Sequence, residues 1–360
     1  MMLHMSSHRL VSLGGFCAAS LAFLGGLSVA NAAEPMVGIR SLAMGDSMRA
    51  MATQSEAMLL NPAGLALSQQ FQVTGFYSLR LPSLGHFLHA SISDSVTNPY
   101  FALGLYYNYL RETPRFGFRL RNGGDDLVQQ VMGADIVRTG HESGTTLAIP
   151  IGQRLTLGAS LKYAYYSLRA QLGQDMAPPG QSAADSRIDR ENSVDLGSTG
   201  SVVTFDFGMT LRPFAGLHVG VVGQNLWPHG YELPTLLGIG LGYQVGDRLL
   251  LAVDTVINFT GNEACSDMTQ TTCNETTRRT TVRVGGGAEY TIAGKVPLRL
   301  GYLYDDNLRA HHATMGLGYV SKDSGFALDV SVRQRVAPGS ETVLLFGIRI
   351  LRDGIAQEGG

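Results

Sequence analysis

The amino-acid sequence predicts an all-β fold, a transmembrane antiparallel β-barrel of about 14 strands with an N-terminal hatch segment inside. From Phe71 onward, hydrophobic and polar residues alternate over segments of about ten residues, the pattern of lipid-spanning strands. Beyond the first thirty-odd residues, no apolar run approaches the roughly 18 residues that a membrane helix needs. A closed barrel is then the remaining way to cross a bilayer.

The segments with this alternation can be counted along the chain. They cover 71–80, 85–93, 100–110, 143–151, 154–168, 201–212, 216–226, 235–245, 248–259, 280–291, 296–305, 311–321, 325–335 and 341–351. An even number of strands returns the chain to the side where it began, and short and long connections then alternate. The long connections at 111–142, 169–200 and 260–279 all fall on one side. A soluble β-sandwich is the alternative, but it favours shorter strands and more surface charge.

The composition limits the possible functions. Only 16% of the 360 residues are charged and the formal net charge is −2, so the chain has no basic footprint for nucleic acid. The 45 glycines suit turns and crowded sheet interiors. No Gly-x-Ser-x-Gly elbow and no His-Glu-x-x-His motif occurs. The sequence therefore gives no reason to expect an enzyme, a metal site or a cofactor.

The N-terminus is typical of an exported protein. Arg9 precedes an apolar run, and Ala30-Asn31-Ala32 offers a cleavage site, which predicts a signal peptide over residues 1–32. An N-terminal membrane anchor is the alternative. We expect a hatch over 33–70, the barrel over 71–352 and a tail over 353–360. In an oxidising compartment, Cys265 and Cys273 are expected to form a disulfide, with a metal site as the rival interpretation.

Charged side chains occupy the positions that the alternation directs into the barrel. These are Lys162, Asp206, Arg212, Asp254, Arg283, Glu289, Arg299, Asp305, Asp329, Arg333 and Arg349. Inside a barrel such charges must pair or be hydrated. One interpretation is a salt-bridged, water-filled lumen, and the other is a selectivity ladder for a polar solute.

Two groups of residues resemble the FadL-type outer-membrane transport family, including its shorter PorV-like relatives. The first group comprises Ala43-Met44-Gly45 and Asn61-Pro62-Ala63-Gly64-Leu65 near the N-terminus. The second contains Asn225-Leu226 and Leu233-Pro234-Thr235. The resemblance implies a fourteen-stranded barrel whose hatch includes Arg40, Asp46, Asn61, Pro62, Ala63, Gly64 and Leu65.

From this resemblance we expect a monomeric transport protein of the bacterial outer membrane. Its partners would be outer-membrane lipids and a hydrophobic or amphipathic, fatty-acid-like small molecule that passes a hatch-gated barrel. Two alternatives remain open at this point. The protein could be a PorV-like partner or shuttle in protein secretion, or a general diffusion channel with a loose plug.

Overall fold

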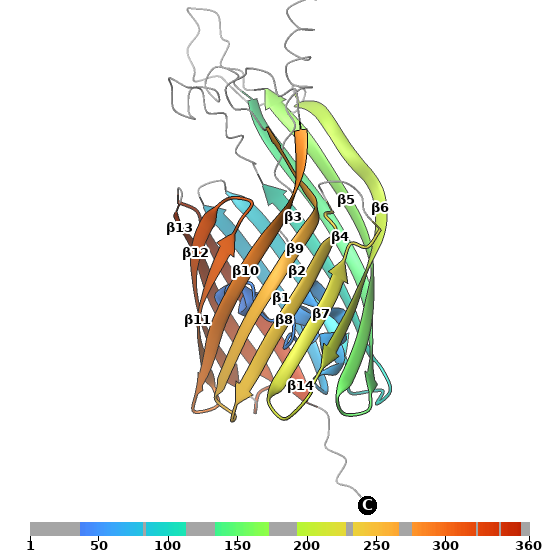
Figure 1. The fold of residues 1–360 in the computed structure, drawn as a ribbon, viewed down its shortest axis with the longest axis vertical. Coiled ribbons are helices and arrows are strands. Elements are labelled where there is room, and N and C mark those ends of the chain that lie inside the picture. Colours follow the sequence, from blue (N-terminus) through green and yellow to red (C-terminus); the bar gives the residue numbers. More distant parts are fainter. Residues whose placement is uncertain are drawn as a thin grey trace, which may run out of the picture.

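The protein folds as one closed antiparallel β-barrel of fourteen strands (Figure 1). The computed structural model describes residues 37–81, 84–112, 134–172, 193–227, 233–265, 276–321, 323–337 and 340–353. Every strand pairs with its neighbours in sequence, and β1 (Gln70–Leu81) pairs with β14 (Thr342–Asp353) to close the wall. Closure pairs neighbouring strands all the way round, as a lipid-facing wall requires, although β6 (Ser193–Leu211) pairs with β7 (Leu217–Gln224) only from Phe207 to Leu211. The predicted fold class is confirmed for the barrel.

The strands follow the predicted segments closely. They are β1 Gln70–Leu81, β2 Gly85–Asp94, β3 Ala102–Glu112, β4 Ala134–Ile151, β5 Leu155–Leu172, β6 Ser193–Leu211, β7 Leu217–Gln224, β8 Leu236–Val245, β9 Leu249–Cys265, β10 Thr276–Ile292, β11 Val296–Asp305, β12 Ala310–Ser321, β13 Phe326–Ala337 and β14 Thr342–Asp353. Strands β4, β5, β6, β9 and β10 run further than predicted, toward the long connections. Their extensions lack the strict apolar and polar alternation of the predicted segments, because pairing continues where the wall no longer needs an apolar face.

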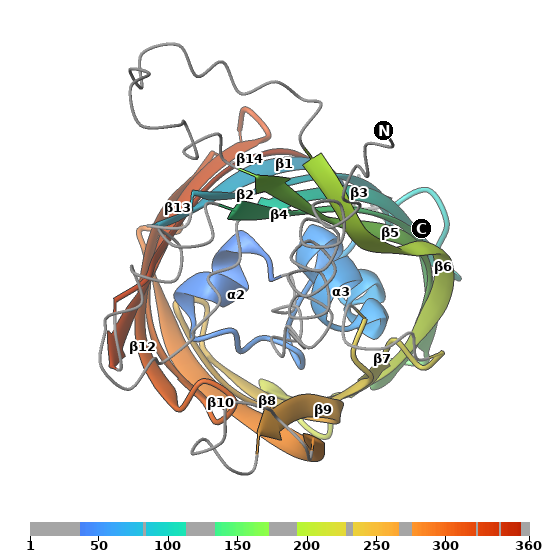
Figure 2. The ribbon, with the colours of Figure 1, turned by 90° about the horizontal axis from the view of Figure 1, so that it is seen from above.

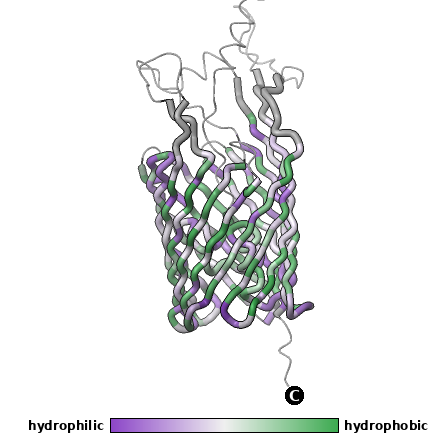
Figure 3. The backbone as a smooth tube through the Cα atoms, turned by 45° about the vertical axis from the view of Figure 1, so that its right-hand side comes forward, coloured by the Kyte–Doolittle hydropathy of each residue, from purple (hydrophilic) through white to green (hydrophobic). Residues whose placement is uncertain are grey.

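Hydrophobic and hydrophilic residues alternate along the strands of the wall (Figure 3). On β6, Val203, Phe205 and Phe207 are exposed, whereas the alternate residues Thr204 and Asp206 are buried. The same parity holds around the barrel, so the side-chain direction inferred from the alternation is confirmed. Among the described residues, none of the helices has the length and apolar character to span a membrane.

The two ends of the barrel differ. The connections between β4 and β5, β8 and β9, and β10 and β11 are short and lie at the end where β14 terminates (Figure 1). The longer connections, after β3, β5 and β9, lie at the opposite end. We call these the short-turn end and the long-loop end.

An inner segment, residues 37–69, lies within the barrel (Figure 2). It contains α2 (Ile39–Ala43), α3 (Gln54–Leu60) and the 3₁₀ helix η1 (Pro62–Ala66). Its buried apolar side chains, such as Leu42 and Met58, form one cluster with wall residues such as Phe76 and Tyr106. The barrel is therefore filled across its middle.

Wall glycines make room for the inner segment. A Cβ at Gly285 would lie 1.8 Å from the Gly45 carbonyl oxygen, and a Cβ at Gly158 would lie 2.3 Å from the Ala63 nitrogen. Gly208, Gly220 and Gly301 stand against the segment in the same way. The high glycine content therefore serves close backbone approach as well as turns.

Several sequence predictions concern residues outside the described ranges. The signal peptide over 1–32, most of the tail over 353–360 and Cys273 all lie there. Cys265 ends β9, but its side chain is outside the description too, so the disulfide stays a prediction.

Candidate functional site

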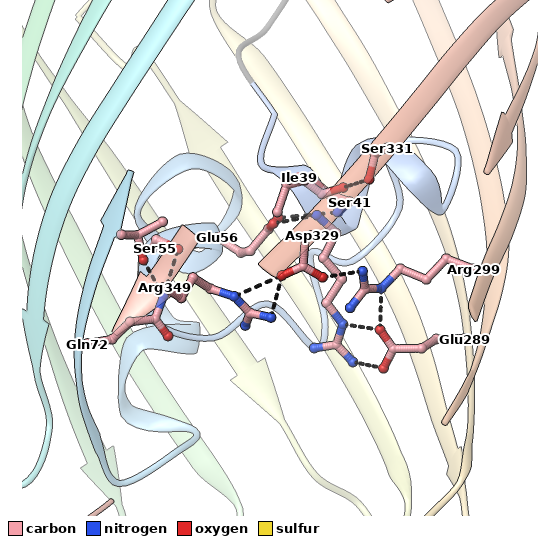
Figure 4. Close-up of polar contacts among 12 residues, drawn as sticks. Ile39, Ser41, Ser55, Glu56, Gln72, Glu289, Arg299, Asp329, Ser331 and Arg349 are labelled. Atoms are coloured by element: carbon pink, nitrogen blue, oxygen red, sulfur yellow. Dashed lines mark hydrogen bonds and ion pairs between the residues drawn. The ribbon is translucent and has the colours of Figure 1, made fainter. Parts of the chain in front are cut away.

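A chain of ion pairs ties α2 to the barrel wall (Figure 4). The Arg40 guanidinium donates two hydrogen bonds to Glu289, at 2.7 and 2.6 Å. Arg299 bridges Glu289 and Asp329, at 2.6 Å each, and Arg349 completes the chain with a 2.6 Å bond to Asp329. Burial opposes the charge of Arg40, but its pair with Glu289 raises its pKa above the ordinary value, so the guanidinium stays charged.

A second cluster holds the turn that follows α2. Arg283 and Arg333 donate to the same Asp46 carboxylate oxygen, at 2.7 and 3.0 Å. Arg283 also pairs with Asp305 at 3.2 Å. Nearby, Thr314 accepts a hydrogen bond from the Gly45 N–H and donates one to the Ala43 carbonyl. The wall thus fixes both charges and backbone groups of this turn.

The third contact is a buried pair between Arg49 and Asp254. The Asp254 carboxylate accepts hydrogen bonds from the Met48 N–H at 2.9 Å, the Arg49 N–H at 2.9 Å and the Arg49 guanidinium at 3.1 Å. Met48 has a φ of 149°, which is rare for a residue other than glycine. Asp254 therefore stabilises a strained stretch of the inner segment.

The Asn61–Leu65 stretch forms the start of η1 and packs on the opposite wall. The Asn61 side chain donates to the Arg49 carbonyl at 2.8 Å and to the Thr210 hydroxyl at 3.2 Å, and accepts from the Ala63 N–H. Proline suits the first position of a helix, where no N–H is needed. Pro62, Ala63, Gly64 and Leu65 are all buried.

Not every predicted lumen charge joins these clusters. Lys162 and Asp206 pair with each other at 2.7 Å, and both contact Asn225 at the end of β7. Arg212 lies one residue beyond the end of β6, is half-buried, and forms no ion pair within the described ranges. Apart from Arg212, the predicted charges therefore separate into three groups tied to the inner segment and one pair beside β7.

Sequence reasoning missed two parts of this arrangement. Glu56 on α3 accepts hydrogen bonds from the Arg40 and Ser41 N–H groups and so caps α2. Arg49 was not singled out either. The inner segment is too short for a periodic pattern to mark Glu56 or Arg49 as functional residues. The one signal in the sequence was Asp254, an inward-facing carboxylate for which a cationic partner could have been sought.

A pocket lies between the inner segment and the part of the wall near the long-loop end. Its apolar lining comprises Val37, Leu42, Phe87, Leu110, Val343 and Leu345, and its polar lining comprises Ser78, Arg80, Glu112, Arg138 and Arg333. Glu112 binds both Arg80, at 3.3 Å, and Arg138, at 2.8 Å. The pocket thus combines six apolar side chains with three arginines and one glutamate.

Comparisons with known proteins agree with this architecture. No family model and no curated protein matches the sequence. A Pseudomonas aeruginosa FadL homologue of known structure aligns with a TM-score of 0.61 at 12% identity, covering 90% of this chain and 100% of its own. The P. putida toluene transporter TodX aligns with a TM-score of 0.58 at 13% identity, covering 89% and 99%. The predicted resemblance is confirmed at the level of the fold: the chain has the fold of the FadL-type outer-membrane barrels.

Proposed function

We propose that the protein is a monomeric transporter of the bacterial outer membrane that takes up an amphipathic small molecule, with the inner segment as its hatch. The observation that carries this proposal is the pocket against α2. It offers six apolar side chains for a hydrocarbon part and, beside them, Arg80 and Arg138, which share Glu112 and could also contact an anionic head. Pockets for small molecules combine apolar linings with a few placed polar groups in this way.

The arginines of the pocket are the groups that a carboxylate ligand would use. Arg80 and Arg138 share Glu112 and Arg333 also binds Asp46, so a ligand carboxylate would exchange with or add to these carboxylates. Arginine binds carboxylates with two parallel hydrogen bonds, which fixes orientation as well as affinity. A toluene transporter is among the structural neighbours. A neutral aromatic ligand would contact only the apolar lining residues of the pocket and not its arginines.

The position of the pocket supports a gating role for the hatch. Val37 and Leu42 belong to the inner segment and are part of the apolar lining. A ligand seated there touches the same segment that fills the barrel. Suppose that the segment can occupy two positions and that the ligand makes better contacts in one of them. Binding then favours that position, by the difference between the ligand's contact free energies in the two positions. A lumen filled in this way favours a gated transporter over a general diffusion channel.

Binding to the purified protein tests the proposal. Oleate serves as the amphipathic probe and toluene as the neutral one, with direct mass spectrometry of retained molecules as a further readout. We expect Arg80→Gln/Arg138→Gln to weaken oleate binding about tenfold, the equivalent of about 1.4 kcal/mol, and to leave toluene binding unchanged. Arg212→Gln is the matched control, because Arg212 lies at the short-turn end, away from the pocket.

Heat-modifiable mobility on gels verifies that each variant is folded. If neither probe binds the wild-type protein and no small molecule is retained, the transport proposal fails. If the double variant binds oleate as well as the wild type does, the pocket is not the site.

A further inference from the structure

An aromatic and basic cluster lies on the outer, lipid-facing surface of β1 to β4. Its members are Tyr77, His86, Tyr107, Tyr109, Arg111 and His141. His86 is directly opposite Arg111 in register, and Tyr109 is directly opposite His141. The Tyr109 and His141 ring centroids are 5.3 Å apart, and those of Tyr77 and His86 are 5.9 Å apart. Four adjacent strands therefore contribute to one continuous surface, which we call the outer cluster.

Tyrosine hydroxyls fix the histidines of the outer cluster. Tyr77 bonds to Nδ1 of His86, and Tyr107 bonds to Nδ1 of His141 at 2.7 Å. With the hydroxyl as donor, the ring hydrogen of each neutral histidine is on Nε2. No described residue binds either Nε2. Each ring therefore presents a hydrogen-bond donor away from its tyrosine.

The outer cluster lies at the level where a membrane interface is expected. His86 is the second residue of β2 and Arg111 the penultimate residue of β3, both at the long-loop end. At the short-turn end, Tyr243, Tyr290 and Tyr319 form a second outward-facing group of tyrosines. Two levels of tyrosine mark the two edges of the apolar band of a membrane barrel.

Arg111 is the residue that requires an explanation. It is exposed, and it forms no ion pair or hydrogen bond with any described residue. Its outward-facing neighbours in register are His86 and Thr139, so no carboxylate faces it from β2 or β4. An arginine on the lipid face costs about 2–4 kcal/mol at the midplane and little near the interface, where an anion can reach it.

A related cluster on β11 and β12 provides an internal comparison. Tyr302 bonds to Nδ1 of His311, and the Tyr304 and His311 ring centroids are 5.1 Å apart. On the next strand, however, the residue opposite His311 is Ala337 and not an arginine. The tyrosine–histidine pair thus occurs on both sides of the barrel, but the arginine partner occurs at the outer cluster.

We propose that the outer cluster binds the phosphate group of an anionic lipid in the outer leaflet. Arg111 supplies the positive charge, and the Nε2–H groups of His86 and His141 supply additional donors on either side. The tyrosine rings pack against the acyl chains below the headgroup. This inference needs only that the barrel spans the membrane, and it is independent of what the lumen carries.

Native mass spectrometry of the full-length protein with bisphosphorylated lipid A tests the inference. We expect Arg111→Gln to lower the bound fraction about fivefold, the effect of one arginine at an anionic lipid surface. Arg352→Gln is the matched control, because Arg352 is also exposed but ends the wall at the short-turn side. His86→Gln is the second variant, and we expect it to lower the bound fraction by a smaller factor.

Two results would overturn the inference. One is that the wild type, Arg111→Gln and His86→Gln retain lipid A equally. The other is that excess inorganic phosphate displaces the lipid from the wild type, since that behaviour identifies a general anion site. A failure of oleate binding at the pocket would leave the outer cluster unaffected, so this inference and the transport proposal fail separately.

Discussion

The two halves of the inner segment are held in the barrel by different kinds of interaction. Residues 37–53 form ion pairs with the wall, from Arg40 to Glu289, from Asp46 to Arg283 and from Arg49 to Asp254, in addition to neutral hydrogen bonds and packing on wall glycines. Residues 54–69 form no ion pair with the wall within the described ranges, and are bound by neutral hydrogen bonds and close packing. The first half faces β7 to β14 and the second faces β1 to β7.

Hydrogen bonds from neutral side chains hold the second half against the wall. Gln54 bonds to Ser93 and Ser95 on and after β2, Gln72 donates to Ser55, and Gln224 donates to the Leu59 carbonyl. The one carboxylate of this half, Glu56, turns toward α2 and caps it. Glu56 thus couples the two halves to each other and not to the wall.

This difference indicates which half is released more easily. A buried ion pair that loses one partner leaves an uncompensated charge, whereas a broken neutral hydrogen bond leaves a polar group with a smaller desolvation cost. The first half is therefore fixed more firmly, and it is also the half that contributes Val37 and Leu42 to the pocket. We expect a ligand to rest on the firm half while the second half loosens first.

The largest effect is expected from Asp254→Ala. It removes three hydrogen bonds to Met48 and Arg49 and leaves the Arg49 guanidinium buried without its partner. The cost should be about 3–5 kcal/mol. Hydrogen exchange of residues 44–53 measures the loss of protection, and ion conductance in planar bilayers should rise as the segment loosens. Unchanged protection at Met48 and Arg49 would contradict the assignment of this half as the ionic one.

A smaller effect is expected from Gly285→Ala, with Gly286→Ala as the matched control. The new methyl at 285 would overlap the Gly45 carbonyl, whereas the nearest heavy atom to a Cβ at 286 is 3.4 Å away. Because backbone meets backbone at 285, we expect a destabilisation of about 3 kcal/mol, and well under 1 kcal/mol at 286. Urea midpoints of the detergent-solubilised protein compare the two. Equal midpoints would mean that the inner segment does not rest against β10.

The same contacts show how far sequence reasoning reaches. The alternation predicts the fourteen strands, and it predicts that Glu289, Arg299 and Asp329 point inward, because the lipid-facing side of each strand must be apolar. It could not pair these charges, since partners such as Glu289 and Arg40 are 249 positions apart. It also placed Glu112 and Arg138 in a predicted connection over 111–142, because β3 and β4 continue past the apolar band.

The smallest effect, and the sharpest comparison, is expected from Asn61→Ala. Asn61 makes four hydrogen bonds, with Arg49, Met209, Thr210 and Ala63, where Asp254 makes three on the other half, but the partners of Asn61 are neutral groups. The loss should be about 1–2 kcal/mol, because each stranded partner is uncharged. Hydrogen exchange over residues 57–66 reports it, with residues 44–53 as the internal reference. If Asn61→Ala costs as much as Asp254→Ala, charge does not distinguish the halves, and the order of release must depend on packing against the wall glycines.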